Sequence, residues 1–266
     1  MSDKKQIADA LRGLADNESA MDVVEKQVEK YRLDLLRPVY KDRDELIGRV
    51  PSFWMVVLSQ HSNFANFIRA SDFKYVDCID DVRVEWDEAN PGNFSVNIKF
   101  HGLEGDFPAQ SVTKRFRLVK VKDDMKVSGN DEDRESGDDD DEEEYERLLS
   151  DPVDVEWPVA YDSINPDKIQ DKRASKKEYR TGMKTLFGWF RWTGLKPGKE
   201  FPNGESLAEL FANDLYPYCV KYYIEAQRDL ADEMSDSDND DSAEEPLELP
   251  SDDDEVQDHS KKRRLE

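Results

Sequence analysis

Apolar residues recur at seven-residue steps through the first 47 residues of the chain, at Ile7, Leu14, Met21, Val28 and Leu35. The intervening positions are mainly charged or polar, which predicts one long helix over residues 5–47 with a narrow apolar stripe. A small domain cannot cover a stripe of about 40 residues, so the pattern favours a dimerisation helix over one packed along its own domain. The predicted dimer-interface residues are Ile7, Leu11, Leu14, Met21, Val24, Val28, Tyr31 and Leu35.

Two irregularities interrupt this pattern. A second apolar residue accompanies several of these seven-residue steps. Leu11 lies four residues after Ile7, whereas Val24 and Tyr31 lie three residues after Met21 and Val28. This change of spacing is a phase slip in the heptad pattern. Pro38 is expected to kink the helix or to break its hydrogen bonds locally.

The hydrophobic period changes twice in the next hundred residues. Three- and four-residue spacing after Pro51 predicts a buried helix over 53–68 and a short helical segment near 72–79. Alternation then predicts antiparallel strands joined by short turns, with one solvated face. The expected strands are 82–86, 94–100, 112–121 and, after an acidic insertion, 153–157.

Helical spacing returns from Ser175 onward. Ser175 with Glu178, and Ser206 with Glu209, have the spacing of capping boxes, which predicts one helix beginning at each serine. The Gly- and Pro-rich segment 194–204 is expected to be the loop between them.

Charge divides the 266 residues into a neutral body and acidic tracts. The formal net charge is −24, residues 123–151 hold 15 acids and 3 bases, and residues 229–258 hold 15 acids and no base. Both tracts are poor in apolar residues and are predicted to be disordered. The expected organisation is a dimerisation helix (1–49), an α+β domain (50–228, including the insertion 123–151) and an acidic tail (229–266).

The residues offer little support for catalysis, metal binding or membrane insertion. The histidines His61, His101 and His259 are far apart and accompany no nucleophile or phosphate-loop motif, so no enzyme activity, metal or cofactor is expected. His61 is interpreted as a core or interface residue. Two cysteines without metal-binding spacing fit a reducing compartment, the start of the chain has no signal-peptide pattern, and residues 50–68 are too polar to span a membrane.

The charge pattern instead predicts basic protein partners. A strongly acidic chain is a poor binder of DNA phosphates, so sequence-specific nucleic-acid binding is not expected. Dense negative charge attracts polycations, of which histones are the abundant nuclear example, although acidic runs can also serve solubility alone. The cluster Lys261, Lys262, Arg263 and Arg264 predicts nuclear import. The basic run Lys172, Arg173, Lys176 and Lys177 is either a protein-docking patch or a solvated helix entrance.

Several segments resemble the nucleosome assembly protein family, and its fungal members in particular. They are Ser59–His61, Arg69–Tyr75, Tyr161–Pro166, Gly188–Pro202 and Tyr216–Tyr223, of which the fourth is the most specific. The resemblance implies an α+β fold in which long helices pair antiparallel into a homodimer. Each helix would carry an earmuff-like domain, with a four-stranded antiparallel sheet and flanking helices, around an acidic concave underside.

The resemblance also implies a nuclear histone chaperone. Its partners would be core histones, with a preference for those of the central tetramer, and a fungal histone lysine acetyltransferase that it stimulates. The implied histone contacts are Glu209 and Asp214 on the last helical segments and Asp252, Asp253, Asp254 and Glu255 in the tail, and the basic run would dock the enzyme. The alternative is a regulatory subunit for which enzyme docking is primary and histone carriage secondary.

Overall fold

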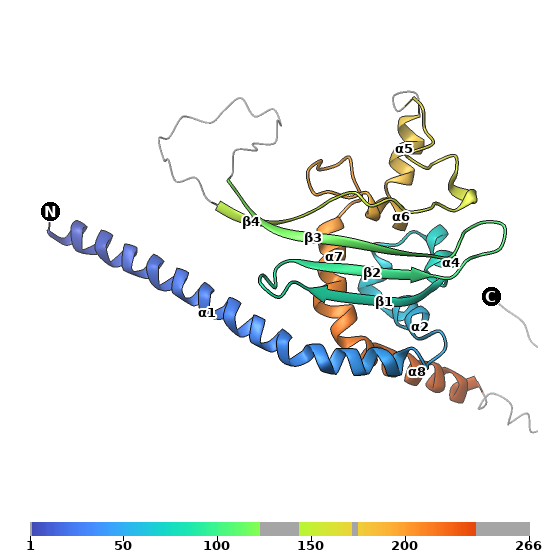
Figure 1. The fold of residues 1–266 in the computed structure, drawn as a ribbon, viewed down its shortest axis with the longest axis horizontal. Helices are drawn as coiled ribbons and strands as arrows, with labels where there is room; N and C mark the ends of the chain where they lie inside the picture. The colour runs from blue at the N-terminus through green and yellow to red at the C-terminus, as the bar shows by residue number, and fades with distance from the viewer. Residues whose placement is uncertain (1, 123–143, 172–174, 238–266) are drawn as a thin grey trace, which may run out of the picture. The chain divides into compact units, whose positions relative to one another are not determined.

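The computed structural model describes residues 2–122, 144–171 and 175–237. Residues 1–227 form one compact unit and a second begins at Arg228. The long helix predicted from the heptad spacing is α1 (Ser2–Ile47), and it continues through Pro38. Figure 1 shows the axis of α1 bending along its length, so the proline does not end the helix.

The C-terminal half of α1 has a second apolar face that packs on the rest of the unit. Leu33 is 2% exposed and Ile47 is buried. The Arg43 guanidinium lies between the rings of Tyr40 and Tyr216, 4.5 and 4.3 Å from their centroids, and donates to the Tyr216 carbonyl oxygen at 2.7 Å. Cation–π contact and a charge-assisted hydrogen bond therefore fix this half of α1 to the last helical segments.

The helix predicted over 53–68 is interrupted. Helix α2 (Phe53–Gln60) ends at His61, whose Nδ1 accepts a hydrogen bond from the Phe64 amide and caps α3 (Ser62–Ala65). The short helical segment expected near 72–79 is η1 (Ala70–Asp72) followed by α4 (Phe73–Val76). A capping side chain explains the break, because it satisfies an amide at the new N-terminus.

Four antiparallel strands form the sheet in the order β1-β2-β3-β4. They are β1 (Ile79–Trp86), β2 (Phe94–Phe100), β3 (Gln110–Lys122) and β4 (Glu144–Ser150). Alternate β2 residues are buried, as the predicted meander with one solvated face requires. Helical segments cover the buried face (Figure 1), where α2 contacts β1 and η3 (Phe211–Leu215) contacts β2.

The prediction that residues 153–157 form the fourth strand was wrong. Residues 151–158 have no regular secondary structure, and β4 lies inside the segment assigned to the acidic insertion. Leu148 is buried, and Glu146 lies opposite Lys120 in the β3–β4 register. An apolar anchor and a cross-strand pair of opposite charge stabilise a strand there despite its acidic composition. The rest of the predicted disordered insertion, residues 123–143, lies outside the described residues. The prediction of disorder from residue 229 onward was wrong as far as Ser237, where the last helix ends, and residues 238–266 also lie outside the described residues.

The C-terminal helices begin after Ser175, as the serine spacing predicts, and after Asn203 instead of at Ser206. They are α5 (Lys176–Gly182), α6 (Leu186–Phe190), α7 (Gly204–Leu210), η3 (Phe211–Leu215) and α8 (Tyr216–Ser237), and η2 (Val159–Tyr161) precedes them. Ser175 precedes α5 without a side-chain cap, and Ser206 lies inside α7, so neither capping box forms. Thr185 instead caps α6 by accepting from the Gly188 amide.

Aromatic rings and one buried carboxylate join these segments into a single core. Trp54, Tyr75, Phe187 and Trp189 are all fully buried. Asp72, which is also fully buried, accepts hydrogen bonds from the Tyr161 hydroxyl and from the Leu186 amide at 2.9 Å. Burial raises the pKa of this carboxyl, and the two hydrogen bonds oppose that rise.

Replacing Gly182 with alanine is expected to lower the free energy of unfolding by about 2 kcal/mol, because a buried backbone must shift. An added Cβ at Gly182 would lie 1.9 Å from the Ile164 carbonyl oxygen. Gly13→Ala is the matched control, since nothing lies within 4 Å of that Cβ. An exposed helical alanine should stabilise by up to about 1 kcal/mol. Urea denaturation of both variants measures the difference, and equal effects would contradict the close packing at Gly182.

Candidate functional site

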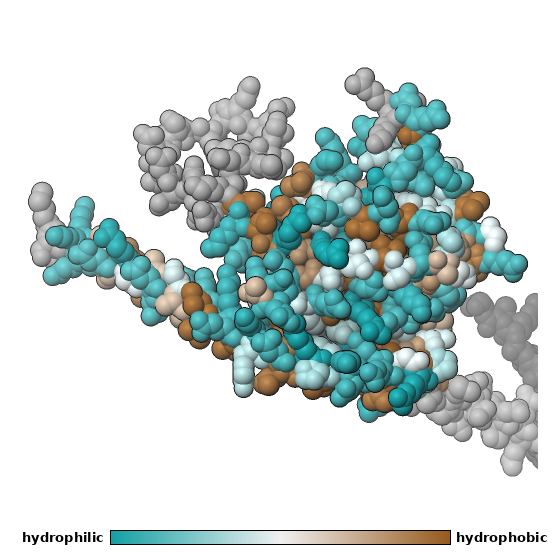
Figure 2. All heavy atoms as spheres, viewed as in Figure 1, coloured by the Kyte–Doolittle hydropathy of each residue, from teal (hydrophilic) through white to brown (hydrophobic). Residues whose placement is uncertain are grey.

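The apolar stripe on α1 is exposed in the single chain. All eight predicted interface residues, from Ile7 to Leu35, have between 56% and 67% of their surface exposed. Val39 and Leu46 extend the same stripe to the end of the helix, at 57% and 59% exposed. Figure 2 shows hydrophobic residues along α1 at the molecular surface among hydrophilic ones. A contiguous exposed apolar stripe of this length is typical of a protein–protein interface.

Asp214 is held in a polar cluster at the junction of α7 and α8. It lies on η3, a short π-helical segment, and its carboxylate accepts from the Tyr222 hydroxyl. Its Oδ2 is 3.4 Å from Nε2 of His61, whose side chain is only 4% exposed. The Asp214 side chain is 32% exposed, so one carboxylate face remains at the surface while the other organises the cluster. The buried position of His61 confirms its interpretation as a core residue.

Glu209 lies on α7 and is exposed. Desolvation and the neighbouring Glu205 both raise the pKa of its carboxyl. Glu205 accepts a hydrogen bond from the Leu148 amide at 2.9 Å, which ties the start of α7 to β4. The structure thus places Glu209 as a surface acid, whereas Asp214 also has a role inside the fold.

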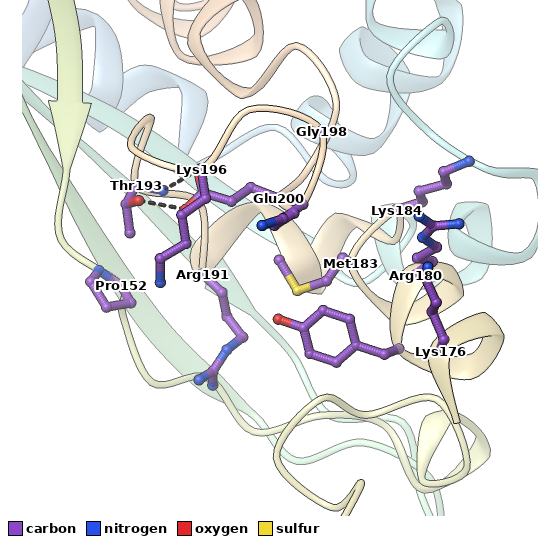
Figure 3. Close-up of a pocket in the computed structure, with 12 residues that line it drawn as sticks. Pro152, Lys176, Arg180, Met183, Lys184, Arg191, Thr193, Lys196, Gly198 and Glu200 are labelled. Atoms are coloured by element: carbon purple, nitrogen blue, oxygen red, sulfur yellow. Dashed lines mark hydrogen bonds between the residues drawn. The ribbon is translucent and has the colours of Figure 1, made fainter. Parts of the chain in front are cut away.

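The described part of the predicted basic run lies beside a cavity of about 670 Å³. Lys176 lines it from the first turn of α5, while Lys177 lines a neighbouring hollow on the same helix. The other cations around the cavity come from α5, from the turn between α5 and α6, and from the segment after α6. They are Arg180, Lys184, Arg191, Lys196 and Lys199. In Figure 3, Lys176, Arg180 and Lys184 line one side of the cavity, and Arg191 and Lys196 line the opposite side.

Sequence reasoning missed this basic cavity because its two sides are separated along the chain. The segment 196–199 forms a turn, as expected, with Gly198 at φ 71° and the Lys199 amide donating to the Lys196 carbonyl at 3.0 Å. That turn brings Lys196 and Lys199 opposite α5. The fold alone creates the concentration of positive charge.

A second missed feature is Lys114, which is fully buried on the core face of β3. Its Nζ donates to the carbonyl oxygens of Asp151, Phe190 and Trp192 at 3.1, 3.0 and 2.8 Å. Burial lowers the pKa of Lys114 to about 7, and the charges of Glu200 and Asp151 partly oppose that shift. The side chain links the sheet to the loops after β4 and α6.

Several predicted residues lie outside the described part of the chain. They are Lys172, Arg173, Asp252, Asp253, Asp254, Glu255, Lys261, Lys262, Arg263 and Arg264. Among residues 2–122, 144–171 and 175–237, no group of three His, Cys, Asp or Glu side chains is arranged to hold a metal ion. No helix in the same ranges combines the length and hydropathy of a membrane span.

The chain is similar throughout to known proteins, although no family-level sequence profile matches it. It is 50% identical to vacuolar protein sorting-associated protein 75 of Saccharomyces cerevisiae over 283 residues, covering 100% of both chains. The chain is also 24% identical to a nucleosome assembly protein of Schizosaccharomyces pombe, over 88% of this chain and 85% of that protein. A crystal structure of Vps75 superposes with a TM-score of 0.71 at 52% identity, over 83% of this chain and 99% of the other.

Fold and sequence together define the class. A long exposed helix beside an α+β domain with a four-stranded antiparallel sheet is the architecture shared with the Vps75 structures. The chain belongs to the nucleosome assembly protein family of histone chaperones. Its likeness to the yeast protein extends over the whole sequence, so the described surfaces lie in the part that the two chains share.

Proposed function

We propose that this protein binds core histones, favouring those of the central tetramer, and delivers them for nucleosome assembly. The observation that carries the proposal is membership of a histone-chaperone family together with an acidic tract, 229–258, of 15 acids and no base. The carboxylates of this tract would attract Lys- and Arg-rich histone segments through many weak contacts. The protein acts by shielding its ligand rather than by transforming it.

The folded body supplies the shape-specific part of binding. Asp214 presents a partly exposed carboxylate held in place by Tyr222 and His61, and Glu209 lies exposed one helical turn and a little more before it. Acids fixed on helical segments lose little entropy on binding, and the tail residues Asp252–Glu255 would add negative charge.

Two copies would join through the α1 stripe in an antiparallel pair. The stripe from Ile7 to Leu35 is exposed in the single chain, and the opposite face of the helix near Leu33 already packs on its own domain. The pairing therefore needs no rearrangement of the body. Lys261–Arg264 would direct the dimer to the nucleus.

Deleting residues 229–258 is expected to weaken histone-tetramer binding about tenfold at physiological ionic strength. Salt at that concentration only partly screens the attraction between the acidic tract and basic histone residues, so the deletion removes a real part of the binding free energy. It should also flatten the dependence of affinity on salt. A matched control keeps the length and replaces each Asp and Glu of the tract with Asn and Gln. Fluorescence titration at several salt concentrations measures both quantities. Unchanged affinity in both variants would remove the tail from the proposal.

A second candidate function is docking and stimulation of a fungal histone lysine acetyltransferase. The observation that favours it is the exposed cationic surface at Lys176 and Lys177, which is unusual in so acidic a chain. In this case enzyme binding would be primary and histone carriage secondary.

Charge reversal separates the two candidates. Lys176→Glu with Lys177→Glu is expected to reduce acetyltransferase binding about tenfold while histone affinity does not fall, because two long-range attractions to the enzyme become repulsions. Lys30→Glu with Lys99→Glu makes the same charge change at exposed positions away from the cavity. Pull-down with purified enzyme and histone titration measure the two affinities. Equal losses in both variants would show a net-charge effect and no docking patch.

A further inference from the structure

We propose that the basic cavity between α5 and the 191–200 segment binds the acidic C-terminal tract of this same protein, residues 238–258. The inference concerns regulation and does not require the proposed histone function, because it is a statement about two parts of one chain. Three features support it: the positive charge of the cavity, the elongated shape of the cationic surface around it and the negative charge of residues 238–258.

The cavity holds an excess of unneutralised positive charge. Six cations line it against one acid, Glu200. Both Glu200 oxygens already accept hydrogen bonds, from Thr193 and from the Gly194 amide at 2.9 Å. Arg191 pairs with Asp167, whereas the other five cations form no ion pair with the residues described here. Like charges gathered on a concave surface repel one another, and an anionic ligand relieves that repulsion.

The shape of the basic surface favours an extended ligand over a compact anion. A second hollow shares Lys176, Arg180 and Lys184 with the cavity and adds Lys177. A third shares Lys184, Lys196 and Glu200 and adds Arg147 on β4 and Glu205, whose carboxylate accepts a hydrogen bond from the Leu148 amide. The cationic surface therefore runs from Lys177 past the cavity to Arg147. An acidic peptide can place successive carboxylates along such a surface, whereas a single phosphate can engage only part of it.

The acidic tract is the matching anion with the highest local concentration. Residues 238–258 contain 11 acids and no base. Fully extended, 21 residues span about 70 Å. A folded body of about 200 residues has a radius of gyration of about 16 Å, so the tract can reach the cavity. Covalent attachment gives the tract an effective concentration in the millimolar range, which weak carboxylate–lysine contacts can exploit.

Docking of the tract would make histone capture and exposure of the basic surface mutually dependent. A polycation that binds the tract removes it from the cavity and leaves Lys176, Lys184 and Lys196 free for an acidic partner. The same carboxylates cannot contact a polycation and the basic cavity at once, so polycation binding and tract docking are linked equilibria.

Zero-length carbodiimide cross-linking of the full-length protein, followed by mass spectrometry, tests the proposal. At low salt, cross-links from 238–258 to Lys184, Lys196 and Lys199 should exceed those to the exposed Lys30 and Lys99 about tenfold. At 1 M salt the two sets should approach equality, because the Debye length falls to about 3 Å and attraction between charges is screened beyond it. Mixing isotopically labelled and unlabelled protein shows whether the tract comes from the same copy or from a second one; cross-links within one copy support the proposal, and cross-links between copies alone would overturn it. Equal cross-linking of all exposed lysines would overturn it, as would cross-links that come from 123–143 in place of the tail.

Two further arms distinguish tail docking from a net-charge effect and from a phosphate site. Lys184→Glu with Lys196→Glu should reduce tail cross-links to the remaining Lys199 at least fivefold, whereas Lys30→Glu with Lys99→Glu should leave them unchanged. Circular dichroism confirms that both variants fold. Inorganic phosphate, added at the ionic strength of a chloride control, should displace the tail no more than chloride does. Selective displacement by phosphate would identify a phosphate site and overturn the assignment to the tail. Histone binding is measured separately, so a negative result here leaves the proposed function intact.

Discussion

Replacing Met21 and Val28 with glutamate is expected to convert the proposed dimer into a monomer. Both side chains lie on the α1 stripe and are more than half exposed in the single chain. In a twofold pair the double substitution removes four apolar side chains, worth about 2 kcal/mol each, and adds four carboxylates without partners. A loss of about 8 kcal/mol corresponds to a dissociation constant weaker by at least about 10⁵-fold.

The matched control is Ala15→Glu with Ser19→Glu. Both positions are exposed on α1 and are not among the eight stripe residues, and the change in net charge is the same. Light scattering or native mass spectrometry at micromolar concentration should give half the mass for the stripe variant only. Circular dichroism should show that the separated chains keep the fold of the body, because Leu33 and Arg43 hold α1 to its own domain. A dimer that survives in both variants would mean that the stripe is not the interface.

Replacing Lys114 with alanine is expected to lower the free energy of unfolding by about 4 kcal/mol, because the change combines a cavity with lost hydrogen bonds. The Asp151 carbonyl keeps a hydrogen bond from the Ser150 hydroxyl, and the Phe190 carbonyl keeps one from the Val153 amide. The Trp192 carbonyl would lose the 2.8 Å bond from Lys114. Lys114→Met keeps most of the volume and should cost about half as much. Chemical denaturation measures both; equal costs would show that the ammonium group contributes little.

The same lysine predicts a dependence of stability on pH. Its pKa is about 7 in the folded protein and about 10.4 in an unfolded chain. Between these values the unfolded chain holds a proton that the folded chain has released, so the contribution to stability rises as pH increases from 7 toward 10. Below pH 7 both states are protonated and the dependence ends. The difference in unfolding free energy between the natural protein and Lys114→Met should therefore change over pH 7–10, and a constant difference would contradict the lowered pKa.

The limits of sequence reasoning are clear at particular residues. Lys114 stands between Val112 and Phe116 on the buried face of its strand, where alternation alone predicts an apolar residue. Its three acceptors are 37 or more residues away in the chain, so only the assembled loops explain it. The fourth strand was misplaced for a related reason. Periodicity favoured 153–157, but pairing with β3 selected Glu144–Ser150.

The sequence by itself determined the features that depend on local order along the chain. Heptad spacing specified the α1 stripe, alternation specified three strands, and composition separated a neutral body from acidic tracts. Hydrophobic period and charge are local quantities, which explains why they can be read without a fold.

Tertiary structure decided everything that depends on distant residues meeting. It gave α1 its second apolar face through Leu33, bound Asp214 to His61 and Tyr222, and gathered Lys184 and Lys196 around one basic cavity. These contacts join segments separated by loops whose path no local pattern specifies. The physical reason is that packing and electrostatics act through space, whereas a sequence pattern records only neighbours along the chain.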